Sequence, residues 1–297
     1  MRSRRHPGRP PRGADRTQAQ DRPSDRGHCP AALYVVGIGP GRLEHLSARA
    51  RRVLEQADTI VGYGTYLDLI RPLVAGKDII SSGMTKEVQR VAAAVAAARA
   101  GRRVALVSSG DPGIYAMAGL ALEMCASRQL KAVPAGVVAV QPDDLQESIG
   151  VEVVPGIPAL CAGAALLGAP LTHDFAVISL SDLLTPWEVI QGRIDAAARA
   201  DFVIVIYNPK SKRRHWQLQR AQELILRHRR DDTPVGVVTG AMRETQRIRI
   251  TRLDHLDGAP IDMQTIVFIG NSTTVRYGDF LFTLRGYGRK YEFDHHF

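Results

Sequence analysis

The sequence predicts an α/β fold with two α/β domains, mixed and largely parallel sheets, and a ligand cleft between the domains. Three observations carry this prediction. Short β-branched runs that end in Gly, Ser, Asn or Pro alternate with helical stretches rich in Ala, Leu and Arg. The second half of the chain has fewer helices and closer strands, so its domain differs in make-up. Small and turn-forming residues follow several strands, at the edge where open α/β sheets bind ligands.

The first domain, residues 31–155, is expected to contain strands at 33–39, 58–63, 78–83, 103–110 and 151–156. The segment Leu130–Gly150 has no clean period, and we interpret its residues 131–148 as an exposed insertion.

The second domain, residues 156–293, is expected to contain strands at 175–181, 201–209, 234–240, 247–253, 265–272 and 280–286. A helix is expected to begin at Thr185, with this threonine as N-cap, Pro186 at the first helical position and Glu188 completing a capping box.

Both ends of the chain are predicted to be tails, at residues 1–30 and 294–297. Residues 1–30 hold eight Arg and three Asp and no Val, Ile, Leu or aromatic residue, so this segment cannot bury apolar surface and is predicted to be disordered. It supplies +5 of the net charge of +9. Two interpretations stay open: a solvated extension without catalytic use, or a segment that binds nucleic acid or a partner.

Composition excludes several classes of protein. The chain has no uninterrupted apolar run long enough to span a membrane and no apolar stretch behind its N-terminal charges, so we expect a cytoplasmic protein. Its three cysteines lie far apart without a CxxC, and its nine histidines are scattered. These spacings predict neither a disulfide framework nor a metal site held by the protein.

The glycine-rich turn "GIGPG" at 37–41 does not match the dinucleotide-binding pattern GxGxxG, because Arg42 stands where the third glycine is needed. Pro40 also lacks the backbone N–H that a pyrophosphate would use. No turn reads GxxxxGK[ST], so a Walker-type phosphate loop is absent from the sequence as well. For this motif alone, a plain strand-to-helix turn stays an alternative.

Four further turns follow strands: "SSGDPGIY" at 108–115, "VVPGIPAL" at 153–160, "VIYNPKSK" at 205–212 and "FIGNST" at 268–273. Together they predict a shared cleft in which the backbone can approach a ligand closely. For Asp111 an alternative is that its carboxylate only caps the following helix.

From Leu33 to about Phe293 the chain resembles the class III tetrapyrrole methyltransferases, which act on corrin and porphyrin rings. The resemblance rests on "VVGIGPG", "ALVSSGDPGIYAMAGL" and "VEVVPGIPAL", of which GxGPG and GDPxxY are shared across that superfamily. The combination of "SSGMTKE", "HDFAVISLSDLLTPW" and "YNPKSK" is narrower and resembles the precorrin-3B C17-methyltransferases. The chain departs from the family pattern in its arginine-rich tail, in the insertion near 131–148 and at Arg42.

The resemblance implies that S-adenosylmethionine is the methyl donor. The residues it places at the donor are Gly110, Asp111, Pro112, Gly113, Ile114, Tyr115, Pro155, Gly156, Ile157, Ser181, Tyr207, Asn208, Gly240, Gly270 and Asn271. The residues it places at the tetrapyrrole are Gly37, Gly39, Pro40, Gly41, Ser82, Met84, Thr85, Lys210 and Lys212.

The implied reaction is S-adenosylmethionine-dependent C17-methylation of precorrin-3B with ring contraction to precorrin-4, in cobalamin biosynthesis. Methyl transfer from a sulfonium depends mainly on alignment. Ring contraction needs a proton acceptor and a donor nearby, for which the candidates are Lys86, Glu87, His173 and Asp174. Each candidate has a structural alternative, as a solvated helix residue or as a satisfied loop pair.

Other functions stay open at this point. The same step on cobalt-factor III fits the motifs, and the superfamily also includes RNA and protein methyltransferases. The folded part lacks a basic stripe interleaved with aromatic residues, so we expect no nucleic acid partner beyond weak contacts of the tail. A non-enzymatic tetrapyrrole carrier would not need the GDPxxY loop. The resemblance further implies a homodimer and hand-over of substrate from neighbouring pathway enzymes.

Overall fold

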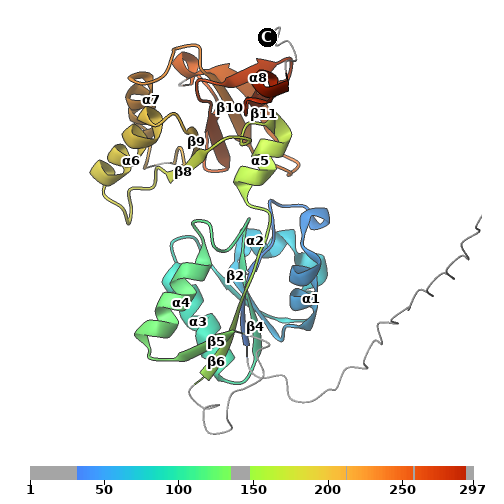
Figure 1. The fold of residues 1–297 in the computed structure, drawn as a ribbon. Coiled ribbons are helices and arrows are strands. Elements are labelled where there is room, and N and C mark those ends of the chain that lie inside the picture. Colours follow the sequence, from blue (N-terminus) through green and yellow to red (C-terminus); the bar gives the residue numbers. More distant parts are fainter. Residues whose placement is uncertain (1–31, 135–147, 212, 257, 292–297) are drawn as a thin grey trace, which may run out of the picture.

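The computed structural model describes residues 32–134, 148–211, 213–256 and 258–291. The chain forms two lobes, each built around its own sheet, and α5 begins where they meet (Figure 1). The boundary that we predict after residue 155 falls between β6 and α5, in the segment that passes from one lobe to the other. The predicted tail at 1–30 lies outside the described residues, as do residues 294–297.

The first sheet has six strands in the order β3-β2-β4-β1-β6-β5, and every neighbouring pair is parallel. Its strands are β1 (Ala32–Gly37), β2 (Thr59–Tyr63), β3 (Asp78–Ser82), β4 (Arg103–Ser108), β5 (Lys131–Pro134) and β6 (Ser148–Val154). All five predicted strands are present. The two ends of the predicted insertion form the edge strand β5, which is mostly exposed, and the start of β6; residues 135–147 lie outside the described part.

Helices cover both faces of the first sheet: α1 (Ala48–Gln56), α2 (Gly64–Leu69), α3 (Glu87–Arg99) and α4 (Met117–Ser127), with 3-10 turns at Leu43–His45 and Arg71–Leu73. Successive side chains of a strand point to opposite faces. Val35 accordingly packs in the core below α3 and α4, and Val36 packs in the core below α1 and α2. Burial on both faces explains the continuous apolar runs in the sequence.

The second sheet has the order β11-β10-β12-β9-β8, and its only parallel pair among the described residues is β8–β9. Its strands are β8 (Phe175–Ser179), β9 (Val203–Tyr207), β10 (Pro234–Thr239), β11 (Arg247–Arg252) and β12 (Thr265–Ile269). A parallel pair needs a crossover, which α6 provides between β8 and β9, whereas β10 and β11 are joined without a helix. The sheet is therefore mixed and mostly antiparallel.

A small third sheet has the order β13-β14-β7, with β7 (Gly168–Ala169), β13 (Thr274–Tyr277) and β14 (Phe280–Thr283). Of these strands only β14 is predicted by the sequence. The helices of this lobe are α5 (Ala159–Leu167), α6 (Trp187–Arg199), α7 (Gln217–Leu226) and α8 (Tyr287–Tyr291), with a 3-10 turn at Leu253–His255.

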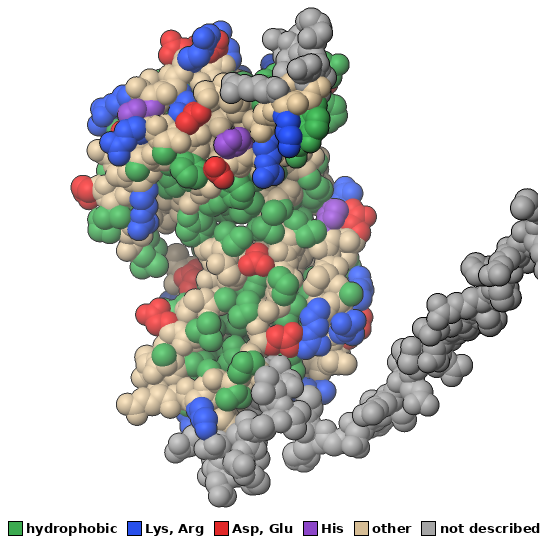
Figure 2. All heavy atoms as spheres, viewed as in Figure 1, with side chains coloured by type: hydrophobic (Ala, Val, Ile, Leu, Met, Phe, Trp, Pro, Cys, Tyr) green, Lys and Arg blue, Asp and Glu red, His purple; other side chains and the backbone are tan. Residues whose placement is uncertain are grey.

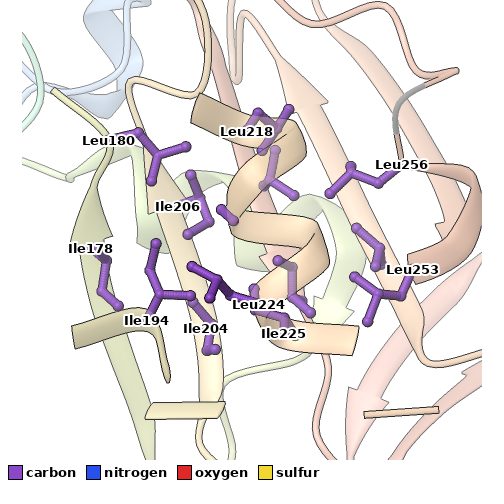
Figure 3. Packing of buried hydrophobic residues seen from close by; sticks show 14 of the residues in the cluster. Ile178, Leu180, Ile194, Ile204, Ile206, Leu218, Leu224, Ile225, Leu253 and Leu256 are labelled. Carbon is purple, nitrogen blue, oxygen red and sulfur yellow. The ribbon is translucent and has the colours of Figure 1, made fainter. Parts of the chain in front are cut away.

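The core of the second lobe lies between its sheet and the helices α6 and α7. Ile204 and Ile206 of β9 pack there against Ile194 and Leu224 (Figure 3). Val205, between the two isoleucines, belongs to the core on the opposite face, beside α5. Complete burial of each such side chain contributes roughly 1.5–3 kcal/mol.

Helix α6 begins later than the sequence predicts. Pro186 is the N-cap residue, and no side chain caps the helix. Thr185 therefore lies one residue outside the cap, and the predicted capping box does not form. Among the residues that the structure describes, no helix is long and apolar enough to cross a membrane.

Candidate active site between the two lobes

A cavity of about 510 Å³ lies between the lobes and is lined by residues of both. Its volume falls within the roughly 300–1,000 Å³ typical of small-molecule sites. Hydrophobic side chains gather at the waist between the two lobes (Figure 2). The predicted site residues that line the cavity are Pro40, Met84, Glu87, Gly110, Asp111, Ile114, Tyr115, Tyr207, Asn208 and Gly240.

Three glycine turns pack against one another at the carboxyl ends of β4, β1 and β6, which are neighbours in the sheet. A Cβ atom on Gly37 would lie 2.7 Å from both the Gly110 oxygen and the Gly156 nitrogen. A Cβ on Gly156 would likewise collide with the backbone of Gly110 and Gly37. Gly39 and Gly110, both with positive φ, exchange backbone hydrogen bonds of 3.1 and 2.8 Å. These glycines let three turns meet, and of the four only Gly110 lines the cavity.

Asp111 fastens two of these turns together. Its Oδ1 accepts a hydrogen bond from the Gly113 N–H at 2.8 Å, and its Oδ2 accepts one from the Gly156 N–H at 3.1 Å. The alternative that Asp111 caps the next helix is wrong, because α4 begins at Met117 with Ala116 as its N-cap. Gly113 itself is exposed, and its φ is not in the left-handed region.

Two tyrosines join the lobes across the cavity. The Tyr115 hydroxyl donates to the Val177 oxygen at 3.0 Å, and the Tyr115 ring lies 5.4 Å from the Tyr207 ring. The Tyr207 hydroxyl accepts from the Leu160 N–H at 2.9 Å, in the first turn of α5. Burial raises the pKa of Tyr207 to about 12 and also raises the pKa of Tyr115. Both hydroxyls are therefore neutral hydrogen-bonding groups at physiological pH.

The turn after β9 is held by side chains of its own lobe. Asn208 has a φ of 51° and donates from Nδ2 to the Ser179 Oγ at 2.9 Å. Ser181 lies at the same edge, where its N–H donates to the Ser179 Oγ at 3.2 Å, but it does not line the cavity. Arg214 is buried and donates to the Asn208 oxygen at 2.8 Å.

The two lysines of this turn, Lys210 and Lys212, were expected at the tetrapyrrole. Lys210 is exposed and does not line the cavity, and Lys212 lies outside the described residues.

The turn "SSGMTKE" reaches the cavity through only two of its predicted residues. Met84 is 59% exposed and lines the cavity, as does the partly buried Glu87 at the start of α3. Thr85 has a φ of 63°, and Lys86 is the exposed N-cap of α3. The Ser82 Oγ accepts a hydrogen bond from Arg90.

The sequence analysis missed two arginines that line the cavity, Arg90 and Arg243. Arg90 is only 5% exposed and lies on α3 in line with the buried Ala94 and Ala98. A charged residue on an otherwise apolar helix face is the signal that could have found it. Arg243 follows β10, and its side chain packs over Gly41, where a Cβ would lie 2.7 Å from the arginine Cγ. For Arg243 the sequence holds no comparable signal.

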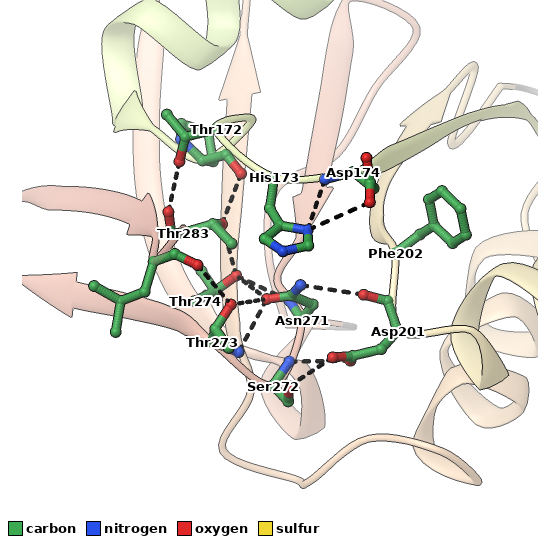
Figure 4. A network of polar contacts seen from close by, with 12 residues as sticks. Thr172, His173, Asp174, Asp201, Phe202, Asn271, Ser272, Thr273, Thr274 and Thr283 are labelled. Atoms are coloured by element: carbon green, nitrogen blue, oxygen red, sulfur yellow. Dashed lines mark hydrogen bonds and ion pairs between the residues drawn. The ribbon is translucent and has the colours of Figure 1, made fainter. Parts of the chain in front are cut away.

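Four predicted residues lie at the other edge of the second sheet. Because β12 runs antiparallel to β9, Gly270 and Asn271 follow Ile269 at the amino end of β9, whereas Tyr207 ends that strand. His173 and Asp174 precede β8 at this same edge, where the Asp174 oxygen accepts from the Val203 N–H (Figure 4). The length of β9 from Val203 to Tyr207, about 13 Å, therefore separates these four residues from the edge at Tyr207.

The expectation that "FIGNST" joins the cleft is therefore wrong. It assumed that all the turns follow parallel strands.

The remaining predicted residues lie in the turns without lining the cavity. The Pro155 oxygen accepts from the Ser47 Oγ at 3.4 Å, and Ile157 is 39% exposed. Neither lines the cavity, nor do Gly41 and the buried Pro112.

Comparison with known proteins decides the family. The model of the tetrapyrrole (corrin/porphyrin) methylases matches residues 32–257. The chain belongs to this family. Tetrapyrrole methylases take their methyl group from S-adenosylmethionine, so this compound is the donor of the present chain.

Several tetrapyrrole methylases are similar over most of the chain. The cobalt-factor III methyltransferase of Priestia megaterium is 47% identical over 87% of this chain, which spans about half (46%) of that protein's length. A probable cobalt-factor III C(17)-methyltransferase of Salmonella typhimurium is 44% identical, covering 86% of this chain and 99% of the relative.

Among solved structures, the methyltransferase CobJ superposes with a TM-score of 0.75 at 33% identity, covering 86% of this chain and all of CobJ. The two structures therefore share the two-lobed α/β fold.

The residues that line the cavity suit S-adenosylmethionine as a ligand. Its wall at Gly110 is backbone without a side chain, which allows a ligand to approach closely. The rings of Tyr115 and Tyr207 add aromatic surface, which attracts a cation such as a sulfonium. Residues of both lobes would hold the donor in this cavity.

Proposed function

We propose that this protein transfers a methyl group from S-adenosylmethionine to C17 of cobalt-factor III, with contraction of the macrocycle, in cobalamin biosynthesis. The observation that carries the proposal is the 44% identity to the Salmonella typhimurium relative, which this chain covers over 99% of its length. The name of that relative states both the substrate and the position of methylation.

The cleft contributes mainly alignment. Transfer between a sulfonium and a ring carbon requires the carbon, the methyl group and the sulfur to lie in line, and holding two reactants in place removes much of the barrier. The packed glycine turns and the hydrogen-bonded Tyr115 and Tyr207 form walls with little freedom to move. In this proposal they hold the donor, and the turns at Pro40 and Met84 face the tetrapyrrole.

Ring contraction needs a group that moves a proton beside the migrating bond. Of the four candidates, Glu87 lines the cavity, and Lys86 neighbours it at the start of α3. We assign the proton transfer to the carboxylate of Glu87. His173 and Asp174 are 42% and 81% exposed in their side chains at the far edge of the second sheet, which leaves them outside this role.

A second candidate function is the same step on the metal-free precorrin-3B. It is favoured by the motifs "SSGMTKE", "HDFAVISLSDLLTPW" and "YNPKSK", which resemble those of the precorrin-3B C17-methyltransferases. Two relatives named for cobalt-factor III are 47% and 44% identical to this chain, and we therefore place cobalt-factor III first.

The test is incubation of the purified protein with labelled S-adenosylmethionine and either cobalt-factor III or precorrin-3B. We expect label in a product of cobalt-factor III that gains one methyl group and shows the absorption of a contracted ring. Label in the precorrin-3B product alone would favour the second candidate, and label in neither would refute both. Sedimentation of the same preparation tests the homodimer that the resemblance implies.

A further inference from the structure

The cavity holds two arginines whose charge has no acidic partner among the residues that the structure describes. Arg90 comes from α3 in the first lobe and Arg243 from the turn after β10 in the second. Neither guanidinium lies within 4.0 Å of a described carboxylate. A guanidinium stays protonated in proteins, so both carry a full positive charge.

Arg90 is held in place by neutral groups. Its Nε donates to the Ser82 Oγ and its Nη2 to the Gly83 oxygen, both at 2.8 Å. The guanidinium carbon lies 5.9 Å from the centre of the Tyr63 ring. These contacts fix the direction of the side chain without neutralising it.

Arg243 reaches from the second lobe to two turns of the first. Its Nε donates to the Pro40 oxygen at 2.7 Å, and its Nη2 donates to the Ser109 Oγ at 3.2 Å. Its Nη1 donates to no described residue. Burial lowers the pKa of Arg243, opposed by the Tyr66 hydroxyl. Burial raises the pKa of Tyr66, which also lines the cavity, and the charges of Arg243 and Arg90 oppose this rise.

Arg229, a buried arginine elsewhere in the protein, has an acidic partner. The Arg229 side chain is 5% exposed, and its Nη1 lies 3.0 Å from the Asp201 carboxylate. A buried charge without such compensation is costly. The two described acidic residues that line the cavity do not supply it: Asp111 accepts from backbone N–H groups with both oxygens, and Glu87 has no ion pair within 4.0 Å.

We propose that Arg90 and Arg243 bind two carboxylates of the tetrapyrrole, one from each lobe, and thereby orient the macrocycle in the cleft. This proposal rests on the proposed function, since it takes the anion to be the peripheral acid groups of that substrate. Arginine presents a planar fork that matches a carboxylate, which suits it to this recognition.

The test compares cobalt-factor III with its methyl ester as ligands of the wild-type protein and of the variants Arg90→Met and Arg243→Met. Calorimetry in the absence of donor gives the dissociation constants. We expect each variant to lose affinity for the free acid roughly ten- to hundredfold, the range for a hydrogen bond to a charged group. For the ester we expect the wild-type protein and the variants to bind alike.

Three controls keep the outcome specific. Arg227→Met removes the exposed arginine that caps the carboxyl end of α7, outside the cavity, and should leave both affinities unchanged. Arg243→Lys keeps the charge but not the fork, and should retain part of the preference for the free acid. S-adenosylhomocysteine should bind every variant within about threefold of the wild type, which also reports that the variants are folded.

The outcomes separate the two proposals. If the wild-type protein binds the free acid and both methionine variants bind it equally well, the arginines are structural and the inference is wrong while the proposed function stands. If the variants lose S-adenosylhomocysteine rather than the tetrapyrrole, the arginines hold the carboxylate of the donor and the inference is wrong as well. If the wild-type protein binds neither tetrapyrrole form, the proposed function fails and the inference fails with it.

Discussion

The two edges of the second sheet carry similar small polar residues in very different states. At the edge near Asn271, its Oδ1 accepts hydrogen bonds from Thr273 and Thr274, and its Nδ2 donates to the Asp201 oxygen at 3.1 Å (Figure 4). Asn271 is 4% exposed, so these contacts satisfy it internally. At the edge near Asn208, the turns face a cavity, and the Nη1 of Arg243 donates to no residue that the structure describes.

This difference shows that a polar turn after a strand is weak evidence for a ligand site. Two further properties decide: whether the strand runs in the same direction as β9, so that its carboxyl end lies at the cavity, and whether the polar groups keep hydrogen-bonding capacity after folding. The edge at Asn271 fails on both counts, because β12 is antiparallel and the asparagine is saturated.

The largest effect is expected from the candidate proton carrier in the cavity, Glu87 of the first lobe, compared with His173 at the far edge of the second sheet. Glu87→Gln should slow ring contraction by roughly 10²–10⁴, because general acid–base catalysis contributes that much. Methyl transfer should persist, so a methylated but uncontracted macrocycle accumulates and is seen by mass and absorption. His173→Ala at the far edge is the matched control and should contract the ring at the wild-type rate; equal rates in both variants would remove Glu87 from the mechanism.

A smaller effect is expected where the glycine turns meet. Gly156→Ala places a Cβ against the backbone of Gly110 and Gly37, which cannot move aside cheaply. The free energy of unfolding should fall by roughly 3 kcal/mol, at the upper end for overpacking, and S-adenosylhomocysteine affinity should fall with it. Gly192→Ala in α6, where a Cβ meets nothing within 4 Å, should instead stabilise the protein by about 0.5–1 kcal/mol. Chemical denaturation measures both, and similar values for the two variants would contradict the packing argument.

Asn271→Ala tests the saturated edge. Loss of the side chain leaves the buried Thr274 hydroxyl with one partner fewer, and we expect the free energy of unfolding to fall by roughly 1–3 kcal/mol. Donor affinity measured by calorimetry should stay at the wild-type value. A selective loss of donor binding in a variant of unchanged stability would return Asn271 to the cofactor site.

The smallest effect concerns Tyr207 and depends on pH. Its pKa in the folded protein is raised from 10.0 to about 12, so the neutral hydroxyl is favoured by folding. The corresponding stability is complete below pH 10 and is lost as the pH rises through 12. Tyr207→Phe should cost about 1 kcal/mol at neutral pH, the usual value of one hydrogen bond. Its unfolding free energy should also fall less steeply between pH 10 and 12 than that of the wild type; parallel pH profiles would contradict the assignment.

The strands of this fold could be predicted well from the sequence, and their directions could not. Every strand predicted from a β-branched run is present, while the short strands β5, β7 and β13 were not predicted. Alternation of side chains is the same in parallel and antiparallel strands, so nothing in "TIVFIGNS" indicates that β12 runs against β9. Because the direction of β12 was unknown, Gly270 and Asn271 were predicted at the wrong edge of the sheet.

The glycine turns of the cavity could be predicted from the sequence, whereas its two arginines, Arg90 and Arg243, were missed. The motif residues Gly110, Tyr115 and Tyr207 line it, because short turns after neighbouring strands meet wherever the strands do. Arg243 lies more than one hundred residues from its partners Pro40 and Ser109, and only the packing of the two lobes joins them.

A crystal structure of the protein with S-adenosylhomocysteine tests the central claim most directly. We predict that the ligand lies in the cavity between the lobes, against the backbone of Gly110 and the rings of Tyr115 and Tyr207. Ligand density at the opposite edge of the second sheet, beside Asn271 and His173, would contradict the account.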